Sequence, residues 1–441
     1  MQTEMFEKVY VINLERRPER LKTFFERLPT DWPFQIPKRY EAIDGEISLP
    51  PRWWKEGNGA WGCYRTHLSI IEKCLNRGID SVLIMEDDAV CVNDFRSNVN
   101  QFLNHLPDDW TMVYFGGQHI QENLRLPRKI NDWVYAPYNV NRTHCYAVRG
   151  RLMLESVYRH LHDYTSWNVS HHVDHYLGEL HKTMEHGLYV PREWMVAQAE
   201  GTSDITRNRQ KYRIFPGAEE TVFPTIDMPC IAILGSWFSG GNTIAGVLRQ
   251  LGFSLGTGLD QVKTNPESLE EPGLKEICRH CYSEPWLEDQ LPYEDRVNLL
   301  RYWAGQQCHQ QRQVFDGLCG TYPLLSLMGS ELLEAWNQPK FIIVERLYEE
   351  CHRVMKRMPW CWHPRGVKYA FERLNQAQES LVNTGDSTRI LQLNYEQIIG
   401  QSDTTVVQLC GFLKLRPTSE QYQNAVHWIQ TSEDDVTFSF E

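Results

Sequence analysis

The sequence predicts an α/β protein with two successive domains. Short apolar runs that end in polar residues alternate with segments whose apolar residues recur at helical spacing, a pattern typical of sheets covered by helices. The chain has 441 residues, more than one hydrophobic core ordinarily serves. Between Thr206 and Pro229 the periodicity is poor and three prolines occur. We therefore predict one domain over residues 1–215 and a second over residues 216–441.

The first half alternates strands and helices. A strand from Lys8 to Leu14 is followed by a helix that Pro18 opens, because proline suits the first helical position. The other expected elements are a strand over 39–45, a helix from Gly62 to Gly78, a strand over 82–85, a helix from Asp94, strands over 110–115, 133–138 and 143–148, and a helix over 151–161. This order favours a mostly parallel, doubly wound sheet.

Three acids end the most apolar of these strands. Glu86, Asp87 and Asp88 follow the run Val82–Met85 directly. The carboxyl ends of strands in open α/β sheets face the ligand crevice. Crowded carboxylates repel one another, and a hard divalent ion such as Mn²⁺ or Mg²⁺ relieves that repulsion. The alternative for three bare acids is a solvated acidic turn.

Basic and acidic side chains near the same edge are further candidates. Arg16 and Arg20 lie four residues apart and can point toward one phosphate, although a solvated helix start is the alternative. Asp174 is a candidate general base toward a hydroxyl, or else a helix cap or ion-pair partner. His171 and His175 have the spacing of a metal pair, but we favour structural roles for them.

In their order, the motifs of the first half resemble glycosyltransferase family 25, the lipopolysaccharide and procollagen galactosyltransferase type. The matching segments span about residues 7–207 and are Val11-Ile-Asn-Leu-Glu-Arg16 with Arg20, Ala42-Ile-Asp-Gly45, Gly62-Cys-Tyr-Arg-Thr-His67, Val82-Leu-Ile-Met-Glu-Asp-Asp88, Val173-Asp-His-Tyr176, and Gln198 with Ser203-Asp-Ile205.

This resemblance implies a GT-A type, Rossmann-like fold, a UDP-sugar donor and Mn²⁺-dependent transfer with inversion. Asp88 would contact the metal, Glu86 would contact the nucleotide and the hydrated metal, and Asp174 would be the base. The donor site would also include Asn13, Arg16, Arg20, Asp44, Gly45, His67 and Asp87.

The second half opens with a strand, Cys230–Leu234, then a glycine-rich loop and a helix, which together form a phosphate cradle. The Walker lysine is missing. With Tyr322-Pro-Leu-Leu-Ser326, Phe341-Ile-Ile-Val-Glu-Arg346 and Asn394-Tyr-Glu-Gln-Ile-Ile399, the half resembles the P-loop fold of PAPS-dependent sulfotransferases. The vestigial phosphate-binding set would be Gly235, Ser239, Gly240, Gly241, Asn242, Thr243 and Arg346.

The active-site match of the second half is poorer than its fold match. Phe238 stands where those enzymes carry a cation, and Val354 stands where a phosphate-binding serine is usual. Losing cations at a polyanion site removes several charge-assisted bonds. We favour a domain that keeps the fold and has lost or altered the activity.

Composition sets the expected partners and compartment. A net charge of −12 with no basic stripe disfavours nucleic acid. The start is too polar for a signal peptide, no apolar run reaches the roughly 18 residues of a membrane span, and twelve cysteines show no disulfide framework. We expect a cytoplasmic protein that meets a nucleotide-sugar and a glycan acceptor, with peripheral membrane contact where that acceptor is lipid-linked.

Three functions follow from these observations. The leading hypothesis is a metal-dependent hexosyltransferase, with galactose as the expected sugar, of the kind used in lipopolysaccharide biosynthesis. The second is a bifunctional enzyme that also transfers sulfate from PAPS. The third is a catalytically silent glycan-binding or scaffold protein.

Overall fold

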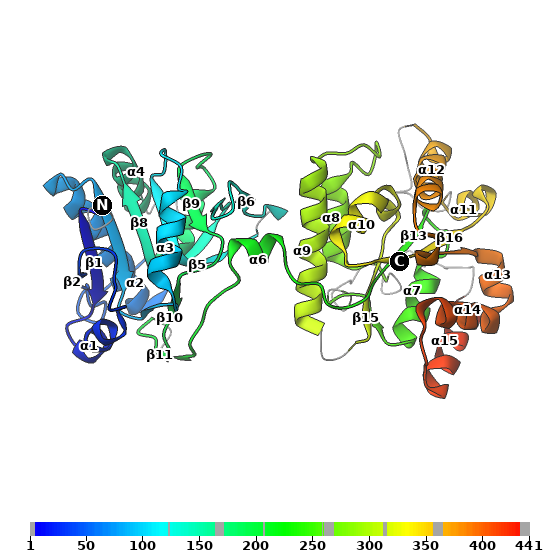
Figure 1. The fold of residues 1–441 in the computed structure, drawn as a ribbon, viewed down its shortest axis with the longest axis horizontal. Helices are drawn as coiled ribbons and strands as arrows, with labels where there is room; N and C mark the ends of the chain where they lie inside the picture. The colour runs from blue at the N-terminus through cyan, green and yellow to red at the C-terminus, as the bar shows by residue number, and fades with distance from the viewer. Residues whose placement is uncertain are drawn as a thin grey trace. The chain divides into compact units, whose positions relative to one another are not determined.

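The chain divides into two compact α/β units. The computed structural model describes residues 5–121, 124–163, 172–205, 208–257, 259, 269–311, 315–355 and 365–432. The units are Met1–Val222 and Phe223–Glu441 (Figure 1). The division falls later than the boundary predicted after residue 215, because Ala218 and Val222 of the short helix α6 (Ala218–Val222) are buried in the core of the first unit.

The first unit is built around a large mixed sheet. Its strands are β1 (Lys8–Asn13), β2 (Lys38–Glu41), β3 (Ser81–Glu86), β4 (Ala89–Cys91), β5 (Met112–His119), β6 (Arg128–Lys129), β7 (Val134–Ala136), β8 (Val140–Arg149), β9 (Leu188–Pro191), β10 (Val196–Gln198), β11 (Gly201–Thr202) and β12 (Arg209–Gln210). Its other helices are α1 (Pro18–Arg27), α2 (Gly57–Arg77), α3 (Phe95–Asn104), α4 (Arg151–His162) and α5 (Val173–His181).

The prediction of a mostly parallel sheet is wrong. The sheet has the order β2-β1-β3-β8-β5-β9-β7-β6. β1 runs parallel to β2 and β3, but β8 runs antiparallel to both of its neighbours, β3 and β5. A strand buried on both faces has the same apolar sequence in either direction, so the pattern of residues 143–148 could not reveal the orientation.

β3 is buried on both faces of this sheet. Val82 and Ile84 pack in a core that includes residues of α2, α4 and α5, whereas Leu83 and Met85 pack in a second core with α1 and α3. Helices on opposite sides of the sheet are visible in Figure 1. This double burial explains the unbroken apolar run, and it brings the strand's polar end to the sheet edge.

Two expected elements have different bounds. α2 begins at Gly57 rather than at Gly62, and β2 ends earlier than expected, at Glu41. The Asp44-Gly45 turn expected to close this strand is present, since the backbone N–H groups of Ile47 and Ser48 donate to the carbonyl oxygen of Asp44.

The second unit contains an all-parallel, five-stranded sheet with the order β14-β15-β13-β16-β17. The strands are β13 (Cys230–Gly235), β14 (Phe253–Ser254), β15 (Gly317–Thr321), β16 (Lys340–Glu345) and β17 (Ile390–Asn394). The helices are α7 (Gly241–Gln250), α8 (Pro272–Cys281), α9 (Tyr293–Gln311), η4 (Pro323–Leu327), α10 (Gly329–Ala335), α11 (Tyr348–Met355), α12 (Val367–Thr384), η5 (Ser387–Arg389), α13 (Tyr395–Gly400), α14 (Ser402–Leu413) and α15 (Ser419–Thr431).

The second unit confirms the predicted strand, glycine-rich loop and helix, because β13 is followed by a loop and then by α7. Within the described ranges of both units, none of the helices combines the length and the apolar character that crossing a membrane requires.

Gly45→Ala tests the packing of the turn after β2. A Cβ atom at Gly45 would lie 1.7 Å from the carbonyl oxygen of Asn58 in α2, so backbone must move. We expect a loss of about 1–3 kcal/mol in the free energy of unfolding, measured by urea titration of the full chain. Gly201→Ala is the matched control, because no atom lies within 4 Å of its Cβ position. Equal stability of the two variants would contradict this packing.

Candidate active site

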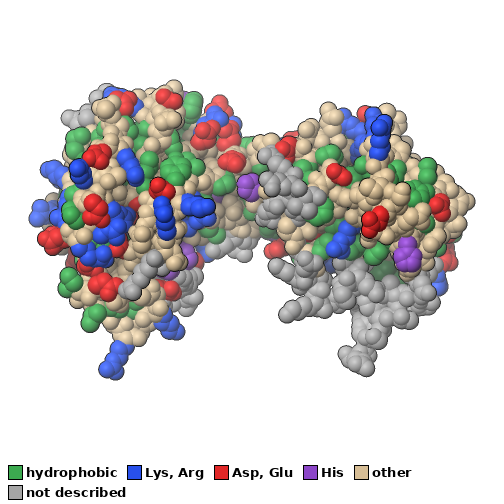
Figure 2. All heavy atoms as spheres, turned by 90° about the horizontal axis from the view of Figure 1, so that it is seen from below, with side chains coloured by type: hydrophobic (Ala, Val, Ile, Leu, Met, Phe, Trp, Pro, Cys, Tyr) green, Lys and Arg blue, Asp and Glu red, His purple; other side chains and the backbone are tan. Residues whose placement is uncertain are grey.

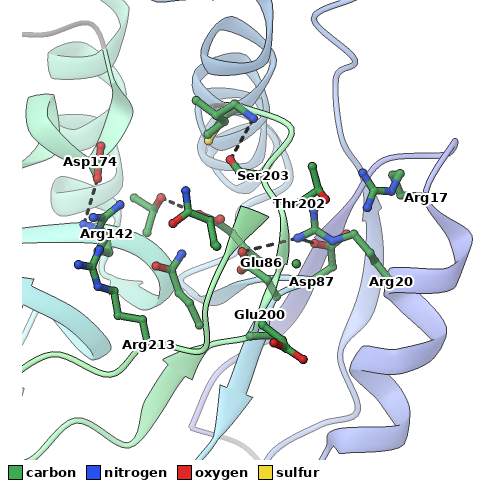
Figure 3. A pocket seen from close by; sticks show the side chains of 18 of the residues that line it. Arg17, Arg20, Glu86, Asp87, Arg142, Asp174, Glu200, Thr202, Ser203 and Arg213 are labelled. Atoms are coloured by element: carbon green, nitrogen blue, oxygen red, sulfur yellow. Dashed lines mark hydrogen bonds and ion pairs between the residues drawn. The ribbon is translucent and has the colours of Figure 1, made fainter. Parts of the chain in front are cut away.

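A pocket of about 480 Å³ opens at the carboxyl end of β3. Its lining includes Arg20 from α1, Glu86 at the end of β3, Asp174 from α5 and Arg213 from the segment after β12 (Figure 3). Asp88, two residues after Glu86, also lines it. These residues are far apart in sequence and converge only through the fold. The volume is in the range of small-molecule ligand sites.

Backbone pairing fixes the acidic turn. Glu86 is the last residue of β3, and the chain turns through Asp87 and Asp88 into β4. β4 pairs antiparallel with β10, and the N–H of Ala199, which follows β10, donates to the carbonyl oxygen of Asp88 at 2.7 Å. The three carboxylates are therefore held on a rigid support rather than on a solvated loop.

Glu86 is held as an anion. Its Oε1 accepts a hydrogen bond from the Thr143 hydroxyl at 2.7 Å and lies 3.5 Å from Nε2 of His67. Burial disfavours the charge, but contact with His67 and Thr143 outweighs burial and lowers the pKa of Glu86. His67 is buried, and its Nδ1 lies 3.0 Å from the Tyr146 hydroxyl, which orients the ring.

The pKa values of Asp87 and Asp88 are raised, whereas that of Glu86 is lowered. Burial raises the pKa of Asp87 to about 6, although Arg20 and Asn13 favour its charged form. Burial and the negative charge of Glu86 raise the pKa of Asp88. The Oδ1 atom of Asp88 is buried and has no hydrogen-bond partner among the described residues. The turn therefore holds more negative charge than the surrounding protein stabilises.

An arginine network borders the acids. Arg20 contacts Asp87, lies 3.6 Å from Asp88 and donates to Asp204 at 3.1 Å. Arg16 and Arg17 also donate to Asp204, at 2.8 and 3.0 Å. In Figure 1, α1 and β11 lie at the bottom of the first unit, and Figure 2 shows the molecule from that side. On this face of the first unit, Lys and Arg side chains are mixed with Asp and Glu side chains. The network orders α1 against the acidic turn.

Asp174 lies in the first turn of α5. Its Oδ2 accepts from the backbone N–H of Arg142 at 3.2 Å, and its Oδ1 accepts from the N–H of His175 at 3.0 Å. The residue before α5 is His172, so Asp174 is not the N-cap. A carboxylate in the first turn of a helix interacts favourably with the helix dipole.

The structure separates the predicted site residues into two groups. Arg20, Glu86, Asp87, Asp88 and Asp174 line the pocket. Among the described residues, the lining does not include the second group, which consists of Asn13, Arg16, Asp44, Gly45 and His67.

Members of the second group support the first. The amide of Asn13 donates to Asp87 at 2.7 Å, and Asp44 accepts from Arg16 at 2.6 Å. Gly45 packs against α2. Of the histidine pair considered from spacing, His175 lines the pocket and His171 lies outside the described residues.

Sequence reasoning assigned no site role to several lining or supporting residues. Thr143 and Arg142 lie at the start of β8, Arg213 follows β12, and Asp204 belongs to the Ser-Asp-Ile motif. The motif was a signal for Asp204, and Arg17 belongs to the basic turn before α1. Arg142 and Arg213 had no signal, because only the antiparallel return of β8 and the pairing of β10 bring them to the pocket.

The residues present fit a divalent cation. Glu86 and Asp88 supply hard oxygen donors, and the partnerless Oδ1 of Asp88 is an acceptor that such an ion would satisfy. A second donor set shares Glu86: its ligand atoms and those of Cys63 and His67 all lie within 4.8 Å of one another. Because sulfur and imidazole suit Zn²⁺ better than Mn²⁺, a metal screen of this pocket has to include both ions.

In the second unit, the glycine-rich loop has the backbone of a phosphate cradle. Gly235 ends β13, Phe238 and Gly240 have φ of 63° and 103°, and Gly241 begins α7, followed by Asn242 and Thr243. The Oγ atom of Ser239 is buried.

Arg346 lies against this loop rather than reaching over it. Its guanidinium donates to the carbonyl oxygen of Phe238 at 3.1 Å and lies 4.1 Å from the ring centroid of Tyr395. The same ring covers Gly240, where a Cβ atom would be 2.1 Å from it. Arg346 and Tyr395 therefore pack directly against two residues of the loop, Phe238 and Gly240.

The first unit is similar to a known protein family. Residues 6–145 match the family model described as glycosyltransferase family 25, LPS biosynthesis protein. The predicted resemblance to family 25 is confirmed. The matched region contains the acidic turn, Arg20, His67 and Thr143, whereas Asp174 and Arg213 lie beyond it.

Curated relatives cover the family 25 region. The chain is 26% identical over 136 residues to a Bos taurus protein named probable inactive glycosyltransferase 25 family member 3, with 26% of this chain and 22% of that protein aligned. It is 24% identical over 140 residues to procollagen galactosyltransferase 2 of Homo sapiens, with 26% and 21% aligned. The matched part is about a fifth of the length of these relatives.

The solved structures that match include sulfotransferases, the family that the second half of the sequence resembles. The sulfotransferase domain from the curacin biosynthetic pathway is 17% identical, with a TM-score of 0.31, 45% of this chain covered and 78% of that chain. Sulfotransferase STF9 from Mycobacterium avium is 13% identical, with a TM-score of 0.32 and coverage of 49% and 71%.

The raised pKa of Asp87 predicts a pH-dependent stability. The folded protein holds a proton on Asp87 up to about pH 6, whereas the unfolded chain releases it near 3.8. Since the folded state binds more protons in this window, wild-type stability falls as pH rises through it. As the pH rises from 4 to 6.5, we expect the free energy of unfolding of Asp87→Asn to increase relative to that of wild type by up to about 3 kcal/mol. The measurement is urea unfolding in the presence of EDTA.

Asp44→Asn is the control for this pH experiment. Burial opposes ionisation of Asp44, but Arg16 and the N–H of Glu46 hold its pKa below the usual value. Its stabilising contribution is fully present above about pH 5 and is lost only at lower pH. Between pH 5 and 6.5 the difference between Asp44→Asn and wild type should therefore stay constant. The same flat profile for Asp87→Asn would refute the assignment.

Proposed function

We propose that the first unit is a divalent-metal-dependent, inverting glycosyltransferase that moves a hexose, expected to be galactose, from a UDP-sugar to a glycan or lipid-linked acceptor. The observation that carries the proposal is the rigid, under-neutralised acidic turn facing the pocket beside Arg20. The similarity to family 25 supports transfer of a sugar. Location in the cytoplasm remains a prediction.

In this proposal each residue has a defined task. Asp88 and Glu86 hold the cation, which when bound stabilises negative charge developing on the departing diphosphate. Arg20 adds positive charge beside Asp88. The two N–H donors to Asp174 hold its carboxylate toward the acceptor hydroxyl.

The chemical step exchanges one bond to the sugar for another. The acceptor oxygen forms a bond to the anomeric carbon while the bond from that carbon to the diphosphate breaks. The proton of the acceptor hydroxyl passes to Asp174, and UDP leaves with the bonding electrons. A base opposite the leaving group is what inversion requires.

Asp88→Asn tests the metal-holding role. We expect Mn²⁺-dependent hydrolysis of UDP-galactose to fall by about 10²-fold, because one of two anionic ligands is lost. The assay compares Mn²⁺, Mg²⁺ and Zn²⁺. Asp132→Asn, whose side chain is 82% exposed, removes the same charge elsewhere in the unit and should leave the rate intact. If wild type binds no UDP with Mn²⁺, or if Asp88→Asn keeps full activity, the proposal fails.

Asp174→Asn tests the base. We expect kcat for transfer to fall by about 10²- to 10⁴-fold, since the amide cannot accept the proton, while KM for UDP-galactose changes little. Unimpaired kcat would remove Asp174 from the mechanism. If wild type binds UDP but never turns it over, the glycan-binding alternative replaces catalysis.

For the second unit we propose a domain without PAPS-dependent transfer. The placement of Arg346 and Tyr395 against the loop supports this. Titration of the full chain with adenosine 3′,5′-bisphosphate should give no binding heat up to millimolar concentration. Micromolar binding that Arg346→Gln abolishes would instead support the bifunctional enzyme.

A further inference from the structure

Two arginines on the Asp174 side of the pocket form a distinct pair. Arg142, in β8, and Arg213, after β12, both line the pocket. Their guanidinium carbons lie 5.3 and 4.7 Å from the ring centroid of Phe215. Figure 3 shows both beside Asp174, with Arg17 and Arg20 on the other side of Glu86. We call Arg142 and Arg213 the Phe215 arginines.

The charges of the Phe215 arginines are not neutralised by protein. Arg16, Arg17 and Arg20 all contact carboxylates. In the described ranges, neither Arg142 nor Arg213 forms an ion pair, and the Nε atom of Arg142 is buried without a hydrogen-bond partner. A buried guanidinium donor without an acceptor is costly, and an anion that accepts two parallel hydrogen bonds satisfies it.

Backbone strain marks the same position. Arg142 has φ of 81°, a left-handed conformation that costs a long side chain free energy and that persists where the surroundings impose it. Its N–H donates to Asp174 in this conformation. One peptide therefore fixes the carboxylate of the proposed base and directs a cationic side chain beside it.

Backbone hydrogen bonds also fix the position of Arg213. Its N–H and carbonyl oxygen pair with those of Gln198, both at 2.9 Å. Gln198 belongs to β10, which pairs with β4 directly after Asp88. Arg213 is thus fixed relative to the acidic turn by backbone hydrogen bonds that run through β10 and β4.

We propose that the Phe215 arginines bind an anionic group, a carboxylate, sulfate or phosphate ester, carried by the acceptor. This rests on the proposed function, in which the acceptor hydroxyl contacts Asp174. The backbone N–H of Arg142 donates to Asp174, so an anion bound by the Arg142 side chain would lie beside the proposed base. Such an anion would belong to the molecule that the base deprotonates. An acceptor without charge would leave two cations of the pocket unpaired.

The test uses four sugars that differ at one position: galactose, galacturonate, galactose 6-sulfate and galactose 6-phosphate. Binding to the full chain is measured by saturation-transfer NMR with and without UDP and Mn²⁺. We expect at least one charged sugar to bind tenfold or more tightly than galactose. Which charged sugar binds best distinguishes carboxylate, sulfate and phosphate. Equal binding of all four, or no binding of any charged sugar, would overturn the proposal.

Variants assign the preference to the arginines. Arg213→Gln and Arg142→Asn, the latter chosen because asparagine tolerates φ above zero, should each reduce the preference about tenfold. Arg159→Gln removes an equal charge from an exposed site outside the pocket lining and should preserve it. If Arg142→Asn does not fold, Arg213→Gln carries the test, since Arg213 is an exposed residue without a positive φ.

UDP affinity separates the two sources of anion. The dissociation constant of UDP with Mn²⁺ is measured for each variant in the absence of sugar. If the variants weaken UDP and leave the sugar preference intact, the arginines bind the donor diphosphate and the acceptor proposal is refuted. If wild type binds no UDP but keeps the charged-sugar preference, the proposed function fails while the anion site stands.

Discussion

The first unit depends on compensating three carboxylates at the buried end of β3. Ionised carboxylates in such surroundings raise each other's pKa and are stable only where cations, hydrogen-bond donors or bound ions offset them. The protein supplies Thr143 and His67 to Glu86, and Arg20 and Asn13 to Asp87. Asp88 receives the least, since its Oδ1 has no partner among the described residues. The incomplete compensation is the feature on which the proposed cation site rests.

The same constraint explains why distant segments meet at this pocket. Asp204, late in the unit, joins Arg16, Arg17 and Arg20 at the start of α1. Single ion pairs at partly exposed sites contribute little stability. Three arginines on one carboxylate, however, fix the orientation of Arg20, which must reach Asp87 and Asp88 together. The network positions charge for the site and contributes only modestly to folding.

The sequence predicted the parts of the site that local pattern encodes. The run Val82–Met85 ending in three acids located both the strand and the sheet edge, and helical spacing located α1 and α2. It could not reveal that β8 runs antiparallel, because an apolar strand reads alike in both directions. Asp44 and Gly45 were assigned to the donor, yet their contacts are to Arg16 and α2. A motif records which residues matter and leaves open whether they touch ligand or other protein.

The two units differ in what their arginines contact, and this difference decides what each can bind. Arg346 donates to the carbonyl oxygen of Phe238, stacks on Tyr395 and has its Nε 3.9 Å from the carboxylate of Glu396, so protein groups that include a carboxylate already surround its charge. Arg142 and Arg213 contact an aromatic ring, and a ring cannot neutralise a guanidinium as a carboxylate does. A fold can therefore keep the backbone of a phosphate loop and lose the free charge that binding needs. In the first unit an uncompensated negative group, Asp88, and two arginines beside Asp174 line one pocket, and this separation of charge is what the proposed transfer between a metal-bound diphosphate and an anionic acceptor would require.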